Sequence, residues 1–162
     1  MKVAFVTDTG TGMSPEQWKQ EGIYCFPLQI ECDGISYDEL ETMNYHQFIQ
    51  NLHQKKIMKT SLPKLGHIED CFQAIKDQGY DTVFCVPICR GLSGAMDAME
   101  MMARQVGLEF IGIDCYVTAV LQATCIRLAK QLYDKGVSMD IIVAKLQAII
   151  ETGDTILIFE DL

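Results

Sequence analysis

Short apolar runs alternate along this chain with longer segments of helical period, and this alternation constrains the fold more than any other feature. Turn residues bound the short runs, and the longer segments repeat apolar residues every three to four positions. Parallel strands buried between layers of helices produce this pattern, because such strands are covered on both faces. The sequence therefore predicts an α/β fold, a mostly parallel sheet flanked by helices on both faces.

The pattern places five strands and six helices. The expected strands are 3–7, 23–30, 82–87, 109–114 and 155–159, of which only the second is long enough to bend or pair locally. The first helix should begin after Ser14-Pro15, because serine can cap a helix and proline suits its first turn. The remaining helices are expected at 45–53, 66–78, 93–106, 118–135 and 138–151.

The size and composition of the chain predict one domain, 1–162, with a substantial core. Its 162 residues are 49% hydrophobic, without an internal repeat or a linker. The odd number of cysteines, seven, indicates reduced thiols in a cytoplasmic protein. The N-terminal apolar run is too short for a signal peptide, and the 18 apolar residues of a membrane span are not found in one run.

Charge and histidine placement argue against three classes of function. A formal net charge of -9 with no Lys/Arg cluster argues against binding to nucleic acid and to anionic membranes. His46, His53 and His67 have no cysteine or carboxylate at metal-ligand spacing, so a metal site is not expected.

Four polar segments follow predicted strands or lead into predicted helices on the same side of the sheet. They are 7–12, 59–63, 89–94 and 114–118. Ligand crevices of open parallel sheets lie at the carboxyl ends of the strands, so these segments should converge there. Their hydroxyl groups, together with free N–H groups at helix starts, suit an anion such as a carboxylate or a phosphate.

Ser93 is the strongest single candidate for an anion ligand. It follows Gly91 and opens a helix directly after a strand, so its backbone N–H and its hydroxyl can both point into the crevice. An equally weighted alternative is that Ser93 only caps its helix. Thr60-Ser61 precedes a proline and should be extended, although such pairs are more often turns or caps.

Asp8 lies just past the first strand, where α/β proteins often place a ligand-orienting carboxylate. Alternatively, it caps the loop that follows. Gly10 and Gly12 allow close backbone approach but match neither a phosphate loop nor a dinucleotide fingerprint, so nucleotide binding is not supported. Cys89 beside Arg90 could be an activated thiolate, but we favour a small apolar residue at a strand end.

Methionines recur at helical spacing after Ser93. Met96 and Met99 form a stripe with Ala103, which most often indicates core packing. Methionine can also line a channel for a flexible acyl chain. Packing is the favoured interpretation without further evidence.

In order along the chain, these segments resemble the DegV family of bacterial fatty-acid-binding proteins. The matching pieces are Val6-Thr7-Asp8-Thr9, Phe26-Pro27-Leu28 with Asp33-Gly34 and Tyr37, Lys59-Thr60-Ser61-Leu62-Pro63, Gly91-Leu92-Ser93-Gly94 and Ile113-Asp114. Each piece alone is weak, but five in the right order are specific.

The resemblance implies a lipid-binding protein that holds a long-chain fatty acid by its carboxylate, through Thr60 and Ser93. On this reading Met96 contacts the acyl chain, and the crevice is shaped by Asp8, Thr9, Ser61, Gly91 and Gly94. It also implies a non-catalytic carrier without a cofactor, which presents its ligand to the catalytic subunit of a fatty acid kinase. Neutral hydroxyls and helix-start amides can hold a buried carboxylate, and burial of the tail contributes about 0.8 kcal/mol per CH₂.

The chain also departs from the family pattern. The resemblance leads us to expect either an isolated first domain or a naturally short relative without the usual second domain, which opens with Gly-Gly-Arg; both predict an open crevice and weaker lipid binding or a homodimer. Cys89-Arg90, Ala95-Met96 and Cys115 replace residues that are often hydroxyl-bearing in the family.

Two alternative functions stay open. One is a phosphotransfer component or a small-metabolite kinase subunit of related fold, for which His67 is the only candidate phosphoacceptor. The other is a dimerising interaction module.

Overall fold

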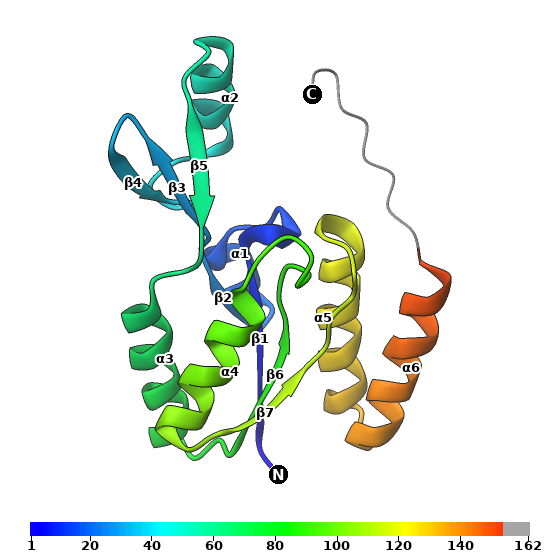
Figure 1. The fold of residues 1–162 in the computed structure, drawn as a ribbon. Helices are drawn as coiled ribbons and strands as arrows, with labels where there is room; N and C mark the ends of the chain where they lie inside the picture. The colour runs from blue at the N-terminus through cyan, green and yellow to red at the C-terminus, as the bar shows by residue number, and fades with distance from the viewer. Residues whose placement is uncertain (154–162) are drawn as a thin grey trace.

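A four-stranded parallel sheet forms the centre of the computed structural model, which describes residues 1–153 (Figure 1). Its strand order is β2-β1-β6-β7, and each neighbouring pair is parallel. The strands are β1 (Val3–Asp8), β2 (Tyr24–Phe26), β6 (Thr82–Val86) and β7 (Glu109–Gly112). All residues of β1 and β6 are buried, as expected for central strands covered on both faces.

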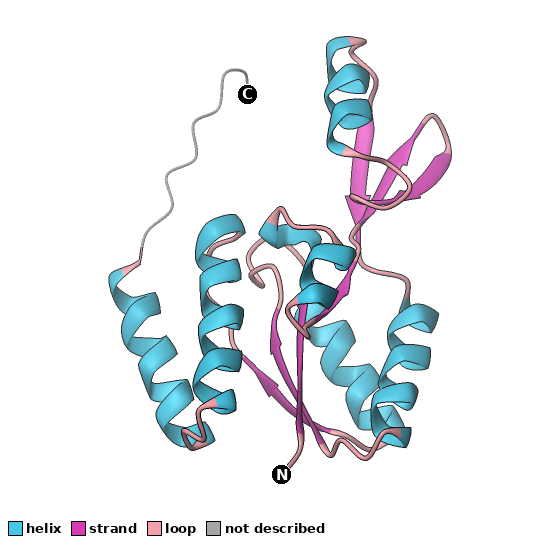
Figure 2. Ribbon diagram, turned by 180° about the vertical axis from the view of Figure 1, so that it is seen from behind, coloured by secondary structure: helices cyan, strands magenta, loops and turns pink. Residues whose placement is uncertain are grey.

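Helices cover both faces of this sheet, so the predicted α/β fold class is confirmed (Figure 2). One face packs against α1 (Pro15–Gln20), α5 (Ala119–Asp134) and α6 (Met139–Thr152). The other packs against α3 (Leu65–Asp77) and α4 (Ala95–Val106). A short 3-10 helix, η1 (Thr9–Thr11), follows β1.

The helix predictions agree with the structure to within a residue or two at most ends. The predicted cap of α1 is present, because the Ser14 hydroxyl accepts a hydrogen bond from the Gln17 N–H and Pro15 occupies the first turn. The helix predicted from Ser93 begins instead at Ala95. The strand predicted at 109–114 ends at Gly112, and the predicted strand 155–159 lies outside the described residues.

A smaller antiparallel sheet stands beyond the carboxyl ends of the parallel strands (Figure 1). Its strand order is β4-β3-β5, and α2 accompanies it. The bounds are β3 (Gln29–Cys32), β4 (Ile35–Asp38), β5 (Met58–Ser61) and α2 (Tyr45–His53). Ile30, Cys32 and Met43 form its own small core.

The prediction of one strand over 23–30 was wrong. The segment breaks at Pro27-Leu28 into β2 of the large sheet and β3 of the small one. Pro27 has no N–H, and the Leu28 N–H donates to the Thr9 hydroxyl at 3.0 Å, so neither residue offers the ladder a donor. The strands β4 and β5 were not predicted, because their residues are largely exposed and lack an apolar alternation.

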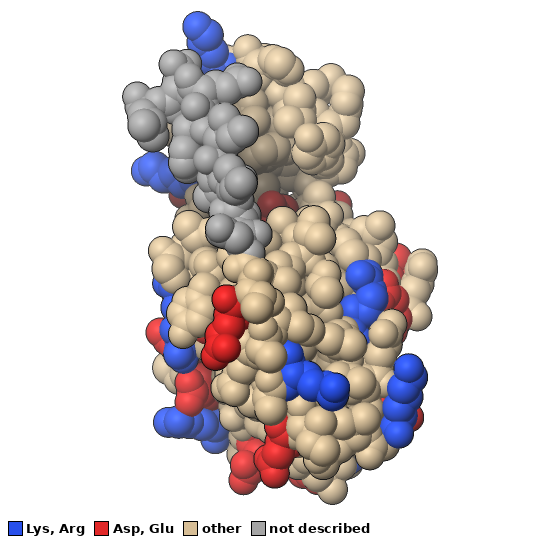
Figure 3. All heavy atoms as spheres, turned by 90° about the vertical axis from the view of Figure 1, so that its right-hand side faces the viewer, with Lys and Arg blue, Asp and Glu red and all other residues tan. Residues whose placement is uncertain are grey.

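Surface charge and helix length bear on possible partners. Figure 3 shows acidic and basic side chains intermixed over the face that α5 and α6 form, without a basic patch. Within residues 1–153, every helix falls short of the length and apolarity that a membrane crossing requires. The same residues contain no group of three His, Cys, Asp or Glu side chains arranged to hold a metal ion.

Candidate functional site

Hydrogen bonds join three of the four polar segments at the carboxyl end of the parallel sheet. These three are 7–12, 89–94 and 114–118. The Ile88 N–H donates to the Asp8 carboxylate at 2.9 Å, and the Thr118 hydroxyl donates to the Gly10 carbonyl at 2.7 Å. The Arg90 N–H contacts the Asp114 carboxylate at 3.4 Å. The parallel topology therefore brings these loops together, because the carboxyl ends of parallel strands meet at one edge.

The remaining polar segment, 59–63, lies against the segment 89–94, and residues of both line a pocket of about 230 Å³. Four of the predicted site residues line it: Thr60, Ser61, Ser93 and Gly94. Its remaining lining is aliphatic and comes from Leu28, Leu62, Ile88 and Leu92. Hydroxyl groups and aliphatic side chains thus share one small cavity whose lining contains no charged residue.

Thr60 and Ser61 reach this pocket because β5 joins the small sheet. Thr60 pairs with Ile30 and Ser61 with Gln29 in the antiparallel register of β3 and β5. The extended conformation predicted before Pro63 is therefore confirmed. Both side chains are exposed, so their hydroxyls are accessible to a ligand.

Ser93 both supports the start of α4 and lines the pocket. Its hydroxyl oxygen accepts a hydrogen bond from the Ala95 N–H at 3.2 Å. A hydroxyl that accepts one bond can still donate its own hydrogen, so Ser93 retains a donor for a ligand. The expectation that its backbone N–H also points into the crevice was wrong, because that N–H donates to the Cys89 carbonyl at 3.1 Å within the loop.

Asp8 is completely buried and does not line the pocket. Its carboxylate accepts hydrogen bonds from the N–H groups of Gly10 and Ile88, each at 2.9 Å. Burial raises the pKa of Asp8 to about 6, against the lowering effect of these donors. Asp8 therefore caps its own loop and also fixes Ile88, one of the residues that line the pocket.

Thr9 plays the corresponding part for Leu28. Its hydroxyl accepts a hydrogen bond from the Leu28 N–H at 3.0 Å and donates one to the Glu39 carboxylate. Desolvation raises the pKa of Glu39, which the Thr9 hydrogen bond opposes. Asp8 and Thr9 thus hold the backbone of two residues that line the pocket, Ile88 and Leu28, without lining it themselves.

Gly91 and Met96 do not line this pocket. Gly91 is exposed in the loop before α4. Met96 is only 1% exposed and packs against Gly112 of β7. A Cβ built on Gly112 would lie 3.2 Å from the Met96 sulfur. Met99 and Met102 belong to the core between the sheet and α3. Their burial there agrees with core packing, the interpretation favoured for the methionine stripe.

Gln122 of α5 was missed from the sequence. Its side chain is fully buried, and its amide nitrogen donates to the Asp8 carboxylate at 2.9 Å and contacts the Thr7 hydroxyl at 3.2 Å. A glutamine on the apolar face of a helix next to Ala123 is a signal that could have identified it.

The other residues considered from the sequence lie elsewhere. His67 contacts the Phe26 ring edge-on, with centroids 5.6 Å apart, and lines a different pocket from Thr60 and Ser93. His46 and His53 are on the exposed helix α2. Cys89 is 5% exposed, which fits a small apolar residue at a strand end.

The chain matches the model of a family described as uncharacterised proteins of the DegV family over residues 2–162. It is 24% identical to a DegV domain-containing protein of Halalkalibacterium halodurans and 28% identical to one of Listeria monocytogenes. Each alignment covers 99% of this chain and 58% of the relative. The chain thus spans little more than half the length of these curated relatives.

Solved structures of the family share the fold. A fatty acid binding DegV protein of Bacillus subtilis aligns with a TM-score of 0.83 at 21% identity. A fatty acid binding DegV family protein of Streptococcus agalactiae aligns with a TM-score of 0.80 at 28% identity. Both alignments cover 93% of this chain and 54% of the neighbour. Since the family model matches all but the first residue, this protein belongs to the DegV family.

Proposed function

We propose that this protein binds a long-chain fatty acid and holds its carboxylate with the hydroxyls of Thr60 and Ser93. The observation that carries the proposal is that these two side chains, one from β5 of the small sheet and one from the loop before α4, line one pocket with four aliphatic residues. The similarity to the fatty acid binding protein of Streptococcus agalactiae supports the same ligand class.

The chemistry of the pocket suits the polar end of such a ligand. A carboxylate needs hydrogen-bond donors when it leaves water, and hydroxyls supply them without a paired cation. Leu28 and Ile88 offer apolar contacts to the first methylenes, each worth about 0.8 kcal/mol when buried. The exposed Leu92 and Leu62 extend this apolar surface for the rest of the tail.

The same pocket supports a carrier rather than a catalyst. Its lining consists of serine, threonine, glycine, leucine and isoleucine, which include neither a general acid–base pair nor an activated nucleophile. A carrier of this kind would present the bound carboxylate to a separate phosphorylating subunit. The seven free cysteines suit a reducing compartment and support a cytoplasmic location for this exchange.

Native mass spectrometry of the protein purified from a bacterial host, followed by extraction and identification of the lipid, tests the proposal. We expect a bound fatty acid, and we expect Thr60→Ala to weaken its affinity about tenfold or more, since a hydrogen bond to a charged group contributes about 1.5–3 kcal/mol. Thr124→Ala removes an exposed hydroxyl on α5 and should leave binding unchanged.

Ser93 needs a variant that preserves its structural contact. Ser93→Asp keeps an oxygen that can accept from the Ala95 N–H but removes the donor and adds a negative charge beside the ligand carboxylate. Binding should be lost while the melting temperature stays near that of the parent. A protein that carries no lipid and takes up no added fatty acid, or a Ser93→Asp variant that binds normally, would refute the proposed site.

A further inference from the structure

The pocket of Thr60 and Ser93 lies where two parts of the molecule meet. Thr60 belongs to β5 of the small sheet, and Ser93 belongs to the loop between β6 and α4. Among residues 1–153, no strand of one sheet pairs with a strand of the other, and the small sheet has its own core. The separation of the two hydroxyls is therefore set by the contacts that join the two parts, not by a shared ladder.

A ring of hydrogen bonds through Glu39 joins these parts. The Leu28 N–H donates to the Thr9 hydroxyl at 3.0 Å, and that hydroxyl donates to the Glu39 carboxylate. The Glu39 N–H donates in turn to the Leu28 carbonyl at 2.9 Å. Thr9 comes directly after β1, whereas Glu39 comes directly after β4. The ring therefore fastens the small sheet to the carboxyl end of β1.

The ring acts on Thr60 through the register of the small sheet. Asp38, which precedes Glu39, pairs with Gln29 of β3. Gln29 pairs on its other side with Ser61 of β5, the residue after Thr60. Ladder hydrogen bonds hold the three strands in this register. A shift of β4 against the end of β1 would therefore also shift β5 against the loop before α4.

A second contact between the same two parts is more exposed. The Lys64 ammonium lies 2.9 Å from the Asp38 carboxylate, and 54% of the Lys64 side chain is exposed. Water and salt screen such a pair, which usually contributes little. In contrast, Thr9 is buried and Glu39 is half-buried, and a hydrogen bond to an ionised group is stronger when it is shielded from water. The contact between Thr9 and Glu39 is therefore expected to dominate the alignment.

We propose that Glu39 is a positioning residue of the fatty acid site: by holding the Thr9 hydroxyl, it aligns Thr60 with Ser93 so that both hydroxyls reach one carboxylate. This inference rests on the proposed function. Glu39 does not itself line the pocket, so it acts on the ligand only through Thr9 and the small sheet.

Titration with cis-parinaric acid, a fluorescent long-chain fatty acid, tests the inference in a double-mutant cycle of Glu39→Ala and Thr60→Ala. Each single change should weaken binding about tenfold, because each removes the hydrogen bond from Thr60 to the ligand carboxylate. The double variant should bind at most about twofold more weakly than either single variant, since the same bond cannot be lost twice. A general loosening of the fold would instead multiply the two losses to about a hundredfold.

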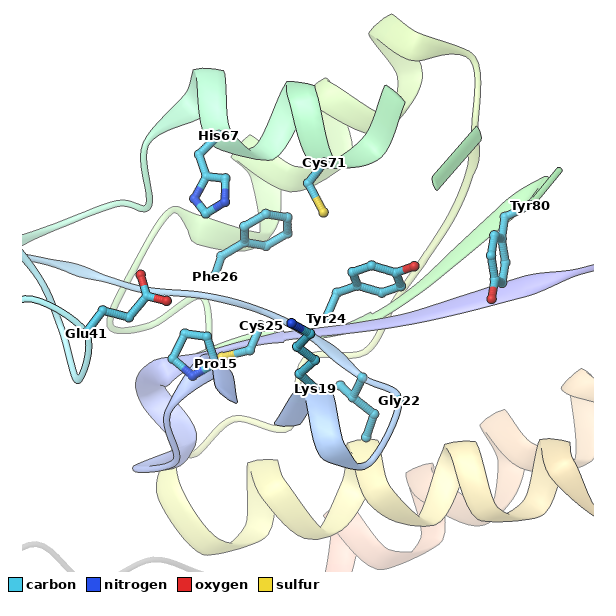
Figure 4. Close-up of a pocket in the computed structure, with 11 residues that line it drawn as sticks. Pro15, Lys19, Gly22, Tyr24, Cys25, Phe26, Glu41, His67, Cys71 and Tyr80 are labelled. Atoms are coloured by element: carbon cyan, nitrogen blue, oxygen red, sulfur yellow. The ribbon is translucent and has the colours of Figure 1, made fainter. Parts of the chain in front are cut away.

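Two further variants show whether the effect belongs to the Glu39 acceptor. Glu39→Gln keeps an oxygen that can accept from the Thr9 hydroxyl and should bind within about threefold of the parent. Glu41→Ala removes a nearby carboxylate that lines a separate pocket of about 480 Å³ along β2 and should bind like the parent (Figure 4). If thermal melting shows that Glu39→Ala does not fold, Glu39→Leu replaces it in the cycle, because leucine fills the half-buried position without an acceptor.

The parent protein separates failure of this inference from failure of the proposed function. If the parent binds the probe but Glu39→Ala binds equally well, or if the losses multiply in the double variant, the positioning role is overturned and fatty acid binding stands. A parent protein that takes up no probe would refute the proposed function and this inference together.

Discussion

The Asp8 carboxylate accepts a hydrogen bond from the backbone N–H of Ile88 at 2.9 Å, across 80 residues of sequence. This bond ties the loop after β1 to the loop after β6, and Ile88 in turn lines the pocket that contains Thr60 and Ser93. Asp8 can therefore control the shape of the pocket without lining it. Its influence on a ligand is expected to act through the backbone that it holds.

Replacing Asp8 with asparagine should lower both stability and fatty acid affinity. An amide offers one acceptor oxygen, so its NH₂ group would face either the N–H of Ile88 or the donors of Gly10 and Gln122. An unsatisfied buried donor costs about 1–3 kcal/mol, which urea unfolding can resolve. Asp70→Asn, at an exposed position on α3, is the matched control and should behave like the parent.

The stability that Asp8 contributes should depend on pH with a defined sign. Burial raises its pKa from 3.8 to about 6, so at pH values between these two the unfolded chain has lost a proton that the folded protein keeps. Its contribution to the unfolding free energy therefore falls as pH rises through this window and is constant above it.

Urea unfolding of the parent and of Asp8→Asn at a series of pH values isolates this effect. The difference between their unfolding free energies should shrink by about 2 kcal/mol from pH 4 to pH 7, since each unit of pKa shift corresponds to about 1.4 kcal/mol and the unfolded carboxyl is already partly ionised at pH 4. A difference that stays flat, or that grows with pH, would show that the Asp8 carboxyl is not held with a raised pKa.

Two glycines of the loops around the pocket should respond differently to alanine. A Cβ at Gly10 would lie 2.8 Å from an Asp8 carboxylate oxygen and 2.9 Å from the Ile88 Cβ, whereas a Cβ at Gly91 meets nothing within 4 Å. Gly10→Ala should destabilise the protein by about 1–3 kcal/mol through overpacking, and Gly91→Ala should be nearly neutral. Thermal melting of the two variants compares these sites directly, and equal effects would contradict the packing seen here.

Gly94 offers a way to fill the pocket without disturbing the fold. Its backbone is not in the left-handed region, and a Cβ there would make only an ordinary contact of 3.7 Å with Leu62. Gly94→Leu should leave the melting temperature nearly unchanged while fatty acid uptake falls by at least about tenfold, the equivalent of about 1.4 kcal/mol. Uptake equal to that of the parent would place the ligand elsewhere, and Gly94→Ala separates the effect of size from that of losing glycine.

The cysteines should be unreactive thiols in the folded protein. Five are buried, and only Cys25 and Cys71 are partly exposed. Burial raises the pKa of Cys71 to about 11 and that of Cys85 well above its usual value, which disfavours the reactive thiolate. A thiol reagent at neutral pH should label at most the two partly exposed residues slowly, and all seven after denaturation. Rapid labelling of Cys89 would instead support the activated thiolate.

The chain sequence determined the two central strands of the large sheet and the helices that cover it, because these depend on local patterns. The apolar runs that became β1 and β6, and the cap at Ser14-Pro15, can be read from a few neighbouring residues. Ser93 was singled out because it follows a parallel strand, and Thr60 because of the family resemblance; the structure places both in the lining of one pocket, and their role as carboxylate ligands stays a prediction.

Tertiary structure decided the features that depend on partners distant in sequence. The break at Pro27-Leu28 follows from the Thr9 hydroxyl that captures the Leu28 N–H, and β4 and β5 form only because β3 offers them a ladder. The role of Asp8 likewise depends on Gln122, which comes from a helix more than a hundred residues away. Local periodicity reports which face of an element is buried, but it carries no information on which donor meets which acceptor once the elements pack.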